Sequence, residues 1–165
     1  MAARIILGAL FLLAMLPHVF AQPYQERLSD NELRAAYCLG YFKAGQQQLQ
    51  NVCQNPTAPM AQACVASEQE QNARTQRVLG YLAAKGVILT PGPNGLDAMV
   101  AVAQGRADFQ SCVNWSKTPE ASACATKCLG LPADEAMKCM NGVNGCLPAL
   151  CRKAATCVNL SYLPY

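Results

Sequence analysis

Apolar residues recur at helical spacing in three stretches of the chain. The first stretch begins at a capping box made by Ser29 and Glu32, in which each side chain accepts a hydrogen bond from a backbone N–H. This pattern predicts a helix that begins there and runs to about Asn51. Its apolar face consists of Leu33, Ala36, Tyr37, Gly40, Tyr41, Ala44, Gln48 and Val52.

Two features of that face bear on its use. Gly40 carries no side chain, which allows a neighbouring helix to approach closely. Tyr37 and Tyr41 are four residues apart and therefore share the face, where they serve either core packing or a platform on which a ligand stacks.

The second stretch predicts a helix from Pro59 to Lys85 that Gly86 ends. Its middle, residues 67–77, reads SEQEQNARTQR and offers almost nothing apolar to a core. Helices that are polar all round are solvated or bridging elements. The segment is therefore either a solvated face or a polar contact surface, for which the candidate residues are Glu68, Glu70, Arg74 and Arg77.

The third stretch predicts a helix from Leu96 to about Val113 with two apolar faces, which are typical of a central, well-covered helix. One face consists of Leu96, Met99, Val100, Ala103 and Ala107, and the other of Val102, Phe109 and Val113. Gly105 lies near the middle of this stretch and lowers the stability of a helix by about 1 kcal/mol relative to alanine. Two shorter helices are therefore the alternative.

Beyond Ser116 the prolines and glycines become frequent, which predicts a set of short helices. The predicted fold is therefore all-α, a small disulfide-stapled helical domain. It has about three longer helices and a cysteine-rich C-terminal set of short helices within residues 112–157.

The N-terminal residues have the pattern of an export signal. Arg4 precedes an apolar run over residues 5–16, then Pro17, then a small residue at Ala21. We predict a signal peptide over residues 1–21, with residues 22–165 forming one exported domain, periplasmic or extracellular. The run is too short for a membrane span, which needs about 20 apolar residues, so no stable membrane insertion is expected after cleavage.

Ten cysteines in an exported chain predict five disulfides, because such compartments are oxidising. They fall into a group of three and a group of seven, and both numbers are odd, so at least one bridge must join the groups. The groups are Cys38, Cys53 and Cys64, then Cys112, Cys124, Cys128, Cys139, Cys146, Cys151 and Cys157.

The predicted pairing is Cys38 with Cys112 and Cys53 with Cys64, with the remaining six cysteines paired among themselves. Each bridge contributes about 2–4 kcal/mol. A domain of this size has no thermodynamic need of five bridges, so we expect them to serve durability against local opening and proteolysis.

The chain has 13 basic and 10 acidic residues without a basic run, which argues against nucleic acid as a partner. Its single histidine, His18, lies in the signal segment, so histidine-dependent catalysis is not available to residues 22–165. No CxxC pair exists for thioredoxin-like redox chemistry, and the cysteine spacings do not favour zinc. We expect no cofactor and no metal.

Two functional hypotheses remain. The first is an exported, non-catalytic binding, inhibitory or envelope-associated protein whose partner is an unidentified protein or envelope component. The second is a small carboxylate-dependent hydrolase that acts on envelope polysaccharide, with two acids whose pKa values are pushed apart. By residue type its candidates are Glu68 with Glu70, Asp134 with Glu135, and Glu120.

Overall fold

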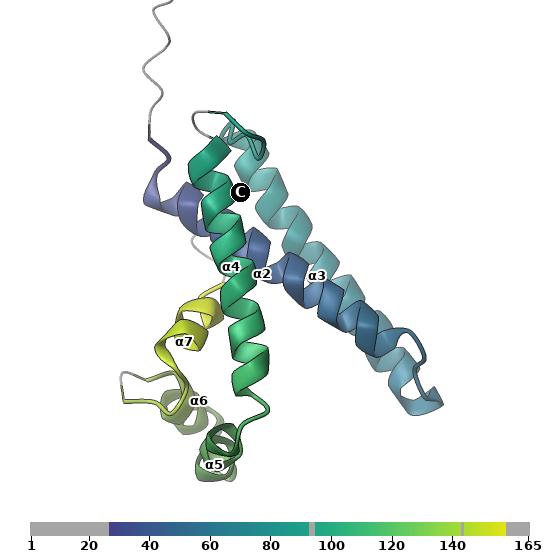
Figure 1. Cartoon of the computed structure of the whole chain (residues 1–165). Helices are drawn as coiled ribbons and strands as arrows, with labels where there is room; N and C mark the ends of the chain where they lie inside the picture. The colour runs from purple at the N-terminus through teal and green to yellow at the C-terminus, as the bar shows by residue number, and fades with distance from the viewer. Residues whose placement is uncertain (1–26, 93–94, 143, 158–165) are drawn as a thin grey trace, which may run out of the picture.

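The computed structural model of this chain describes residues 27–92, 95–142 and 144–157. In these ranges all regular structure is helical, and three long helices precede three short ones (Figure 1). The long helices are α2 (Asp30–Cys53), α3 (Ala58–Ala84) and α4 (Gly95–Trp115), and the short ones are α5 (Pro119–Cys128), α6 (Ala133–Asn141) and α7 (Ala149–Ala155). The predicted all-α class is confirmed, while the predicted signal peptide lies outside the described residues.

The ends of the first two long helices follow from local signals in the sequence. At the start of α2, the backbone N–H of Glu32 donates to Ser29 Oγ over 3.3 Å, and the backbone N–H of Ser29 donates to Glu32 Oε2 over 2.7 Å. This is the predicted capping box. After α3, Gly86 adopts a φ of 67°, which only glycine reaches without strain, and the chain turns as predicted.

Helix α4 is continuous, and Gly105 does not divide it. A Cβ at Gly105 would overlap the carbonyl oxygen of Tyr37 on α2, and a Cβ at Gly40 would overlap the carbonyl oxygen of Val102 on α4. The two glycines thus face each other's helices where α4 crosses α2 (Figure 1). The prediction of a close approach at Gly40 is confirmed, and Gly105 is explained as its counterpart.

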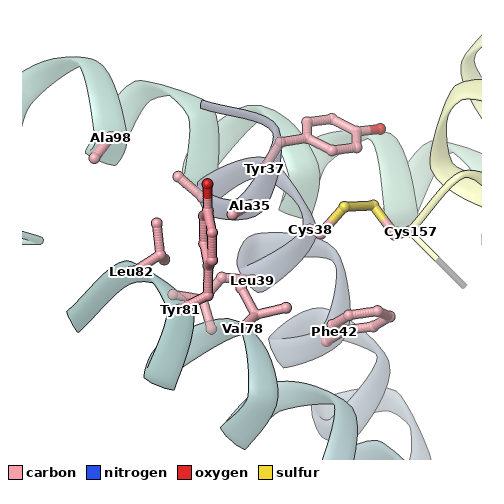
Figure 2. Close-up of a cluster of buried hydrophobic side chains, with 11 residues drawn as sticks. Ala35, Tyr37, Cys38, Leu39, Phe42, Val78, Tyr81, Leu82, Ala98 and Cys157 are labelled. Carbon is pink, nitrogen blue, oxygen red and sulfur yellow. A yellow bond between two sulfur atoms is a disulfide. The ribbon is translucent and has the colours of Figure 1, made fainter. Parts of the chain in front are cut away.

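The main core lies between α2 and α3 and is closed by the first turns of α4 (Figure 2). Its largest fully buried side chains are Phe42, Leu39, Leu82 and Val78. Helix α2 packs against both α3 and α4 and is therefore the central helix. Helix α3 also contributes Thr75, which is buried and donates its hydroxyl to the carbonyl oxygen of Gln71 over 2.9 Å.

The expectation that α4 is covered on both apolar faces is wrong. Its buried residues are the small ones Gly95, Ala98 and Gly105, and Val102 and Phe109 of one predicted face are partly buried against α2 and the core. The other predicted face is exposed, with Leu96 and Val100 each 61% and Met99 38% accessible. We call this face, with its two alanines, the α4 stripe: Leu96, Met99, Val100, Ala103 and Ala107.

All ten cysteines are paired, but only one of the two specific pairings predicted from the sequence is right. Cys53 and Cys64 form the predicted bridge across the α2–α3 connection. The other bridges are Cys38–Cys157, Cys112–Cys151, Cys124–Cys146 and Cys128–Cys139. The inference that a bridge joins the two groups of cysteines is confirmed by Cys38–Cys157.

The predicted Cys38–Cys112 bridge does not form, because the two cysteines lie at different distances from the crossing of α2 and α4. Cys38 lies beside the crossing, two residues before Gly40, whereas Cys112 lies two turns beyond Gly105. Two turns advance a helix by about 11 Å, and a disulfide joins Cα atoms no more than about 7 Å apart. Helix α7 packs along α4, so that Cys151 reaches Cys112 and Cys157 reaches Cys38.

Candidate functional site

An open groove with a volume of about 930 Å³ lies between the first halves of α2 and α4, with α7 at one end. Because the two helices touch at the glycine crossing and separate before it, their N-terminal halves form its two walls. Its apolar lining consists of Leu28, Leu33, Val100 and Ala101. We call this feature the α2–α4 groove. Val100 also belongs to the α4 stripe, so the stripe adjoins the groove at this residue, while Met99 and Ala103 of the stripe line a separate, smaller hollow.

Tyr37 closes the groove at the end next to the crossing, where Figure 2 shows it near the Cys38–Cys157 bridge. Its hydroxyl donates a hydrogen bond to Asp108 Oδ2 over 2.9 Å, and Gln104 Nε2 donates to Asp108 Oδ1 over 2.6 Å. Both carboxylate oxygens of Asp108 therefore accept hydrogen bonds from within the fold.

Burial raises the pKa of the Tyr37 hydroxyl above its usual range, and the hydrogen bond and negative charge of Asp108 raise it further. Tyr37 therefore remains a neutral hydrogen-bond donor. Lys153 Nζ lies 4.4 Å from the centre of the Tyr37 ring, within the range of a cation–π interaction. Tyr41, in contrast, packs edge-on against Phe109 with ring centres 5.0 Å apart, which supports the core-packing interpretation for that residue.

Charged residues of both signs line the groove. Arg34 and Lys153 lie near Tyr37, at the closed end. Asp30 and Asp97 lie in the first turns of α2 and α4, at the open end. There the positive end of each helix dipole stabilises their negative charge. Arg27 precedes α2 and adds a third cation to the rim.

The contact surface predicted from the sequence lies elsewhere, on α3. Glu68, Glu70 and Arg77 are exposed, Arg74 is partly buried, and the guanidinium of Arg74 pairs with the carboxylate of Glu70 one turn earlier. These four residues are thus on one helix, and none of them lines the α2–α4 groove. Their role in binding stays a prediction.

None of the acids named for a hydrolase lines the groove. Its acids are Asp30 and Asp97, which the residue pattern did not single out. Glu120, at the start of α5, accepts hydrogen bonds from its own backbone N–H and from the Thr118 hydroxyl, and both lower its pKa. A general acid needs a raised pKa. Asp134 and Glu135 are exposed in the first turn of α6, and the hydrolase hypothesis stays a prediction.

One cluster in the described chain has donor atoms spaced for a metal: the sulfur atoms of Cys124, Cys128 and Cys146, which lie within 4.8 Å of one another. All three are in disulfides. A thiolate is the sulfur form that binds metal, so the oxidised protein does not offer these ligands.

The groove residues that the sequence analysis missed were signalled in part by the apolar face of α4 that contains Leu96 and Val100. That face was assigned to a core, but no helix within the described ranges covers it. Arg27, Arg34 and Lys153 gave no signal, because they come together only through the crossing of α2 with α4 and the return of α7.

Comparisons with known protein families, with curated proteins and with solved structures find no match to this chain. The fold and the groove therefore define the class to which the protein belongs: a disulfide-stapled all-α protein with an apolar groove and a charged rim. No helix in the described ranges has the length and apolar character that a membrane span requires.

Proposed function

We propose that this chain is an exported, non-catalytic binding protein that holds an amphipathic helix of a partner protein in the α2–α4 groove and on the α4 stripe. The observation that carries this proposal is the exposed apolar face of α4 directly beside the groove. Single exposed apolar residues are ordinary in soluble proteins, but a contiguous apolar surface is typical of an interaction site.

The shape of the surface favours a helix as the occupant. A partner helix that docks in a groove contributes apolar side chains at positions i, i+3, i+4 and i+7. The groove offers two helical walls, and beside it Leu96, Val100 and Ala103 follow one another along the exposed face of α4 at matching intervals. A helix whose apolar stripe spans two or three turns therefore fits the length of the α4 stripe.

The charges of the rim set the direction of that helix. Lys153 at the closed end favours an acidic residue or a carboxylate, and Asp30 and Asp97, which outnumber Arg27 at the open end, favour lysine or arginine. Opposite charges at the two ends contribute more to orientation and to the association rate than to affinity. The preferred partner thus has an acidic end near Tyr37.

The proposed export is supported by the cysteines and by the N-terminal sequence. Disulfides persist in oxidising compartments, and this chain contains five. The apolar run over residues 5–16 provides the signal that delivery to such a compartment requires.

The experiment is site-specific photocrosslinking of the full chain in its source cells, with the photoreactive amino acid at position 100 or at position 129. Val100 and Leu129 are both exposed, at 61% and 76%, but only Val100 lines the groove. We expect a protein crosslink from position 100 that maps to an apolar segment with helical periodicity, and none from position 129. Crosslinks to lipid or glycan, equal crosslinking from both positions, or none from position 100 would contradict the proposal.

A further inference from the structure

Two disulfides of the C-terminal region touch each other. Cys124–Cys146 and Cys128–Cys139 both begin on α5, where Cys124 and Cys128 are one turn apart and therefore face the same side. The Sγ atoms of Cys128 and Cys146, which belong to different bridges, lie 3.6 Å apart. Since neither sulfur carries a hydrogen in the oxidised protein, this is a direct contact between sulfur atoms.

We propose that these two disulfides form a single thiol–disulfide exchange site that reacts with an external dithiol protein. A disulfide is exchanged when a thiolate attacks one of its sulfur atoms and displaces the other. The contact between Cys128 and Cys146 places a future thiolate beside the neighbouring bridge, and rotation of the freed Cys128 side chain brings it into line with the Cys124–Cys146 bond. The inference does not depend on the proposed binding function, since it concerns α5 and α6 and not the groove.

Within the Cys128–Cys139 bridge, burial decides which sulfur atom the external thiolate attacks. Cys128 is 3% exposed, whereas its partner Cys139 is half-buried on α6, a helix with no fully buried residue. The thiolate of the partner therefore bonds to Cys139 Sγ, and the Cys128–Cys139 bond breaks. Its electron pair leaves on Cys128, which becomes a thiolate, and Cys139 is held in a mixed disulfide with the partner.

The second step transfers the exchange to the adjacent bridge. The Cys128 thiolate bonds to Cys146 Sγ, the Cys124–Cys146 bond breaks, and its electron pair leaves on Cys124. The second thiolate of the partner then attacks the mixed disulfide and releases Cys139. In sum, the external dithiol loses two electrons and becomes a disulfide. The protein gains these electrons, retains a new Cys128–Cys146 bridge, and holds Cys124 and Cys139 as thiols once each has taken up a proton.

The Cys53–Cys64 bridge provides an internal control. It closes the connection between α2 and α3, which Figure 1 shows apart from α5 and α6. Its sequence separation of 11 residues equals that of Cys128–Cys139. Reduction there should free Cys53 and Cys64 themselves and create no new linkage.

The test is limited reduction of the native full-length protein with less than one equivalent of dithiothreitol, followed by an acid quench and alkylation. Cleavage after Met137 and Met140 in acid and then after Lys127 separates the four cysteines of the site, and mass spectrometry identifies the linked fragments. We expect alkylated Cys124 and Cys139 together with a Cys128–Cys146 linkage that untreated protein lacks. Alkylation of Cys128 and Cys139 with Cys124–Cys146 intact would overturn the proposal.

A variant makes the same step visible without a reductant. Cys139→Ala leaves an odd cysteine in the site, and the exchange predicts that a free thiol is found on Cys124. A free thiol on Cys128 alone would count against the exchange. The wild-type experiment remains decisive if this variant does not fold, because it uses the native protein.

Discussion

The long helices and the C-terminal short helices are held together by different means. Helices α2, α3 and α4 bury large apolar side chains, among them Phe42, Leu39 and Leu82. In the described part of residues 119–157, the buried residues are Ala121 and four cysteines: Cys124, Cys128, Cys151 and Cys157. Sulfur atoms thus take the place of a hydrophobic core in the C-terminal region.

This difference explains the number of disulfides, which the size of the chain does not. Fewer than about 40 residues rarely bury enough apolar surface to fold without crosslinks, and α5, α6 and α7 belong to a segment of that length. Four of the five bridges have at least one end in residues 112–157. The expectation that the bridges serve only durability is therefore incomplete, because the C-terminal region depends on them.

The largest effect is expected at the crossing in the packed region. Gly105→Ala would place a methyl group on the backbone of α2, where rigid main-chain atoms cannot move aside. Since α2 and α4 must then separate, we expect a loss of about 4 kcal/mol or more in the free energy of unfolding. Denaturant unfolding followed by circular dichroism measures it.

Gly80→Ala on α3 is the matched control for that substitution. A Cβ at Gly80 meets no atom within 4 Å, so alanine adds helix propensity without a clash. It should stabilise the protein by about 0.5–1 kcal/mol. If both variants changed stability by similar amounts, the close crossing of α2 and α4 would be wrong.

The second prediction compares the two bridges with equal sequence separation. One double variant replaces Cys128 and Cys139 by alanine, and the other replaces Cys53 and Cys64. Each opens a loop of 11 residues, and the chain entropy of such a loop lowers the free energy of unfolding by about 2–3 kcal/mol. In the first double variant we expect amide protection of α5 and α6 to fall at least tenfold. In the second we expect protection in the middle of α2 and α3 to persist, because apolar packing holds them.

Hydrogen exchange with mass spectrometry resolves the two regions. Loss of protection throughout α2 and α3 on opening Cys53–Cys64 would show that the long helices also depend on their bridge. Unchanged protection of α5 and α6 on opening Cys128–Cys139 would contradict the view that sulfur forms their core.

Sequence patterns predicted the helices well, because capping, periodicity and turn residues are local. Ser29, Glu32 and Gly86 act within one turn of the positions that they define. The α2–α4 groove and most of the disulfide pairing, in contrast, depend on how the helices cross, and local patterns did not predict them. Gly40 indicated a close approach, but nothing local showed that Gly105 is its counterpart or that the chain returns to bring Cys157 to Cys38.

The third prediction concerns Tyr37, which links the packed region to the groove. Tyr37→Phe removes the hydrogen bond to Asp108 and should cost about 1–2 kcal/mol at pH 8. The pKa of Tyr37 is raised in the folded protein, so its contribution is complete below about pH 10 and is lost as the pH rises through the folded value.

The stability of the wild type should therefore fall above pH 10, and the difference between wild type and variant should shrink. Burial also raises the pKa of Tyr41 and of Tyr81, so part of the alkaline loss should persist in Tyr37→Phe. Urea unfolding at pH 8 and pH 11 tests this. A difference that is the same at both pH values would contradict the raised pKa of Tyr37.

The smallest effect on stability is expected on the polar face of α3. The Glu70–Arg74 pair lies between neighbouring turns of one helix, and exposed pairs of this kind contribute about 0.3–0.5 kcal/mol. Replacing Glu68, Glu70 and Arg74 together by alanine should therefore change the free energy of unfolding by less than about 1 kcal/mol. Because the fold is left intact, the variant separates the two candidate surfaces. If crosslinking from position 100 continues unchanged, the partner uses the groove without α3. If the crosslink disappears while the unfolding curve stays in place, α3 belongs to the same contact surface.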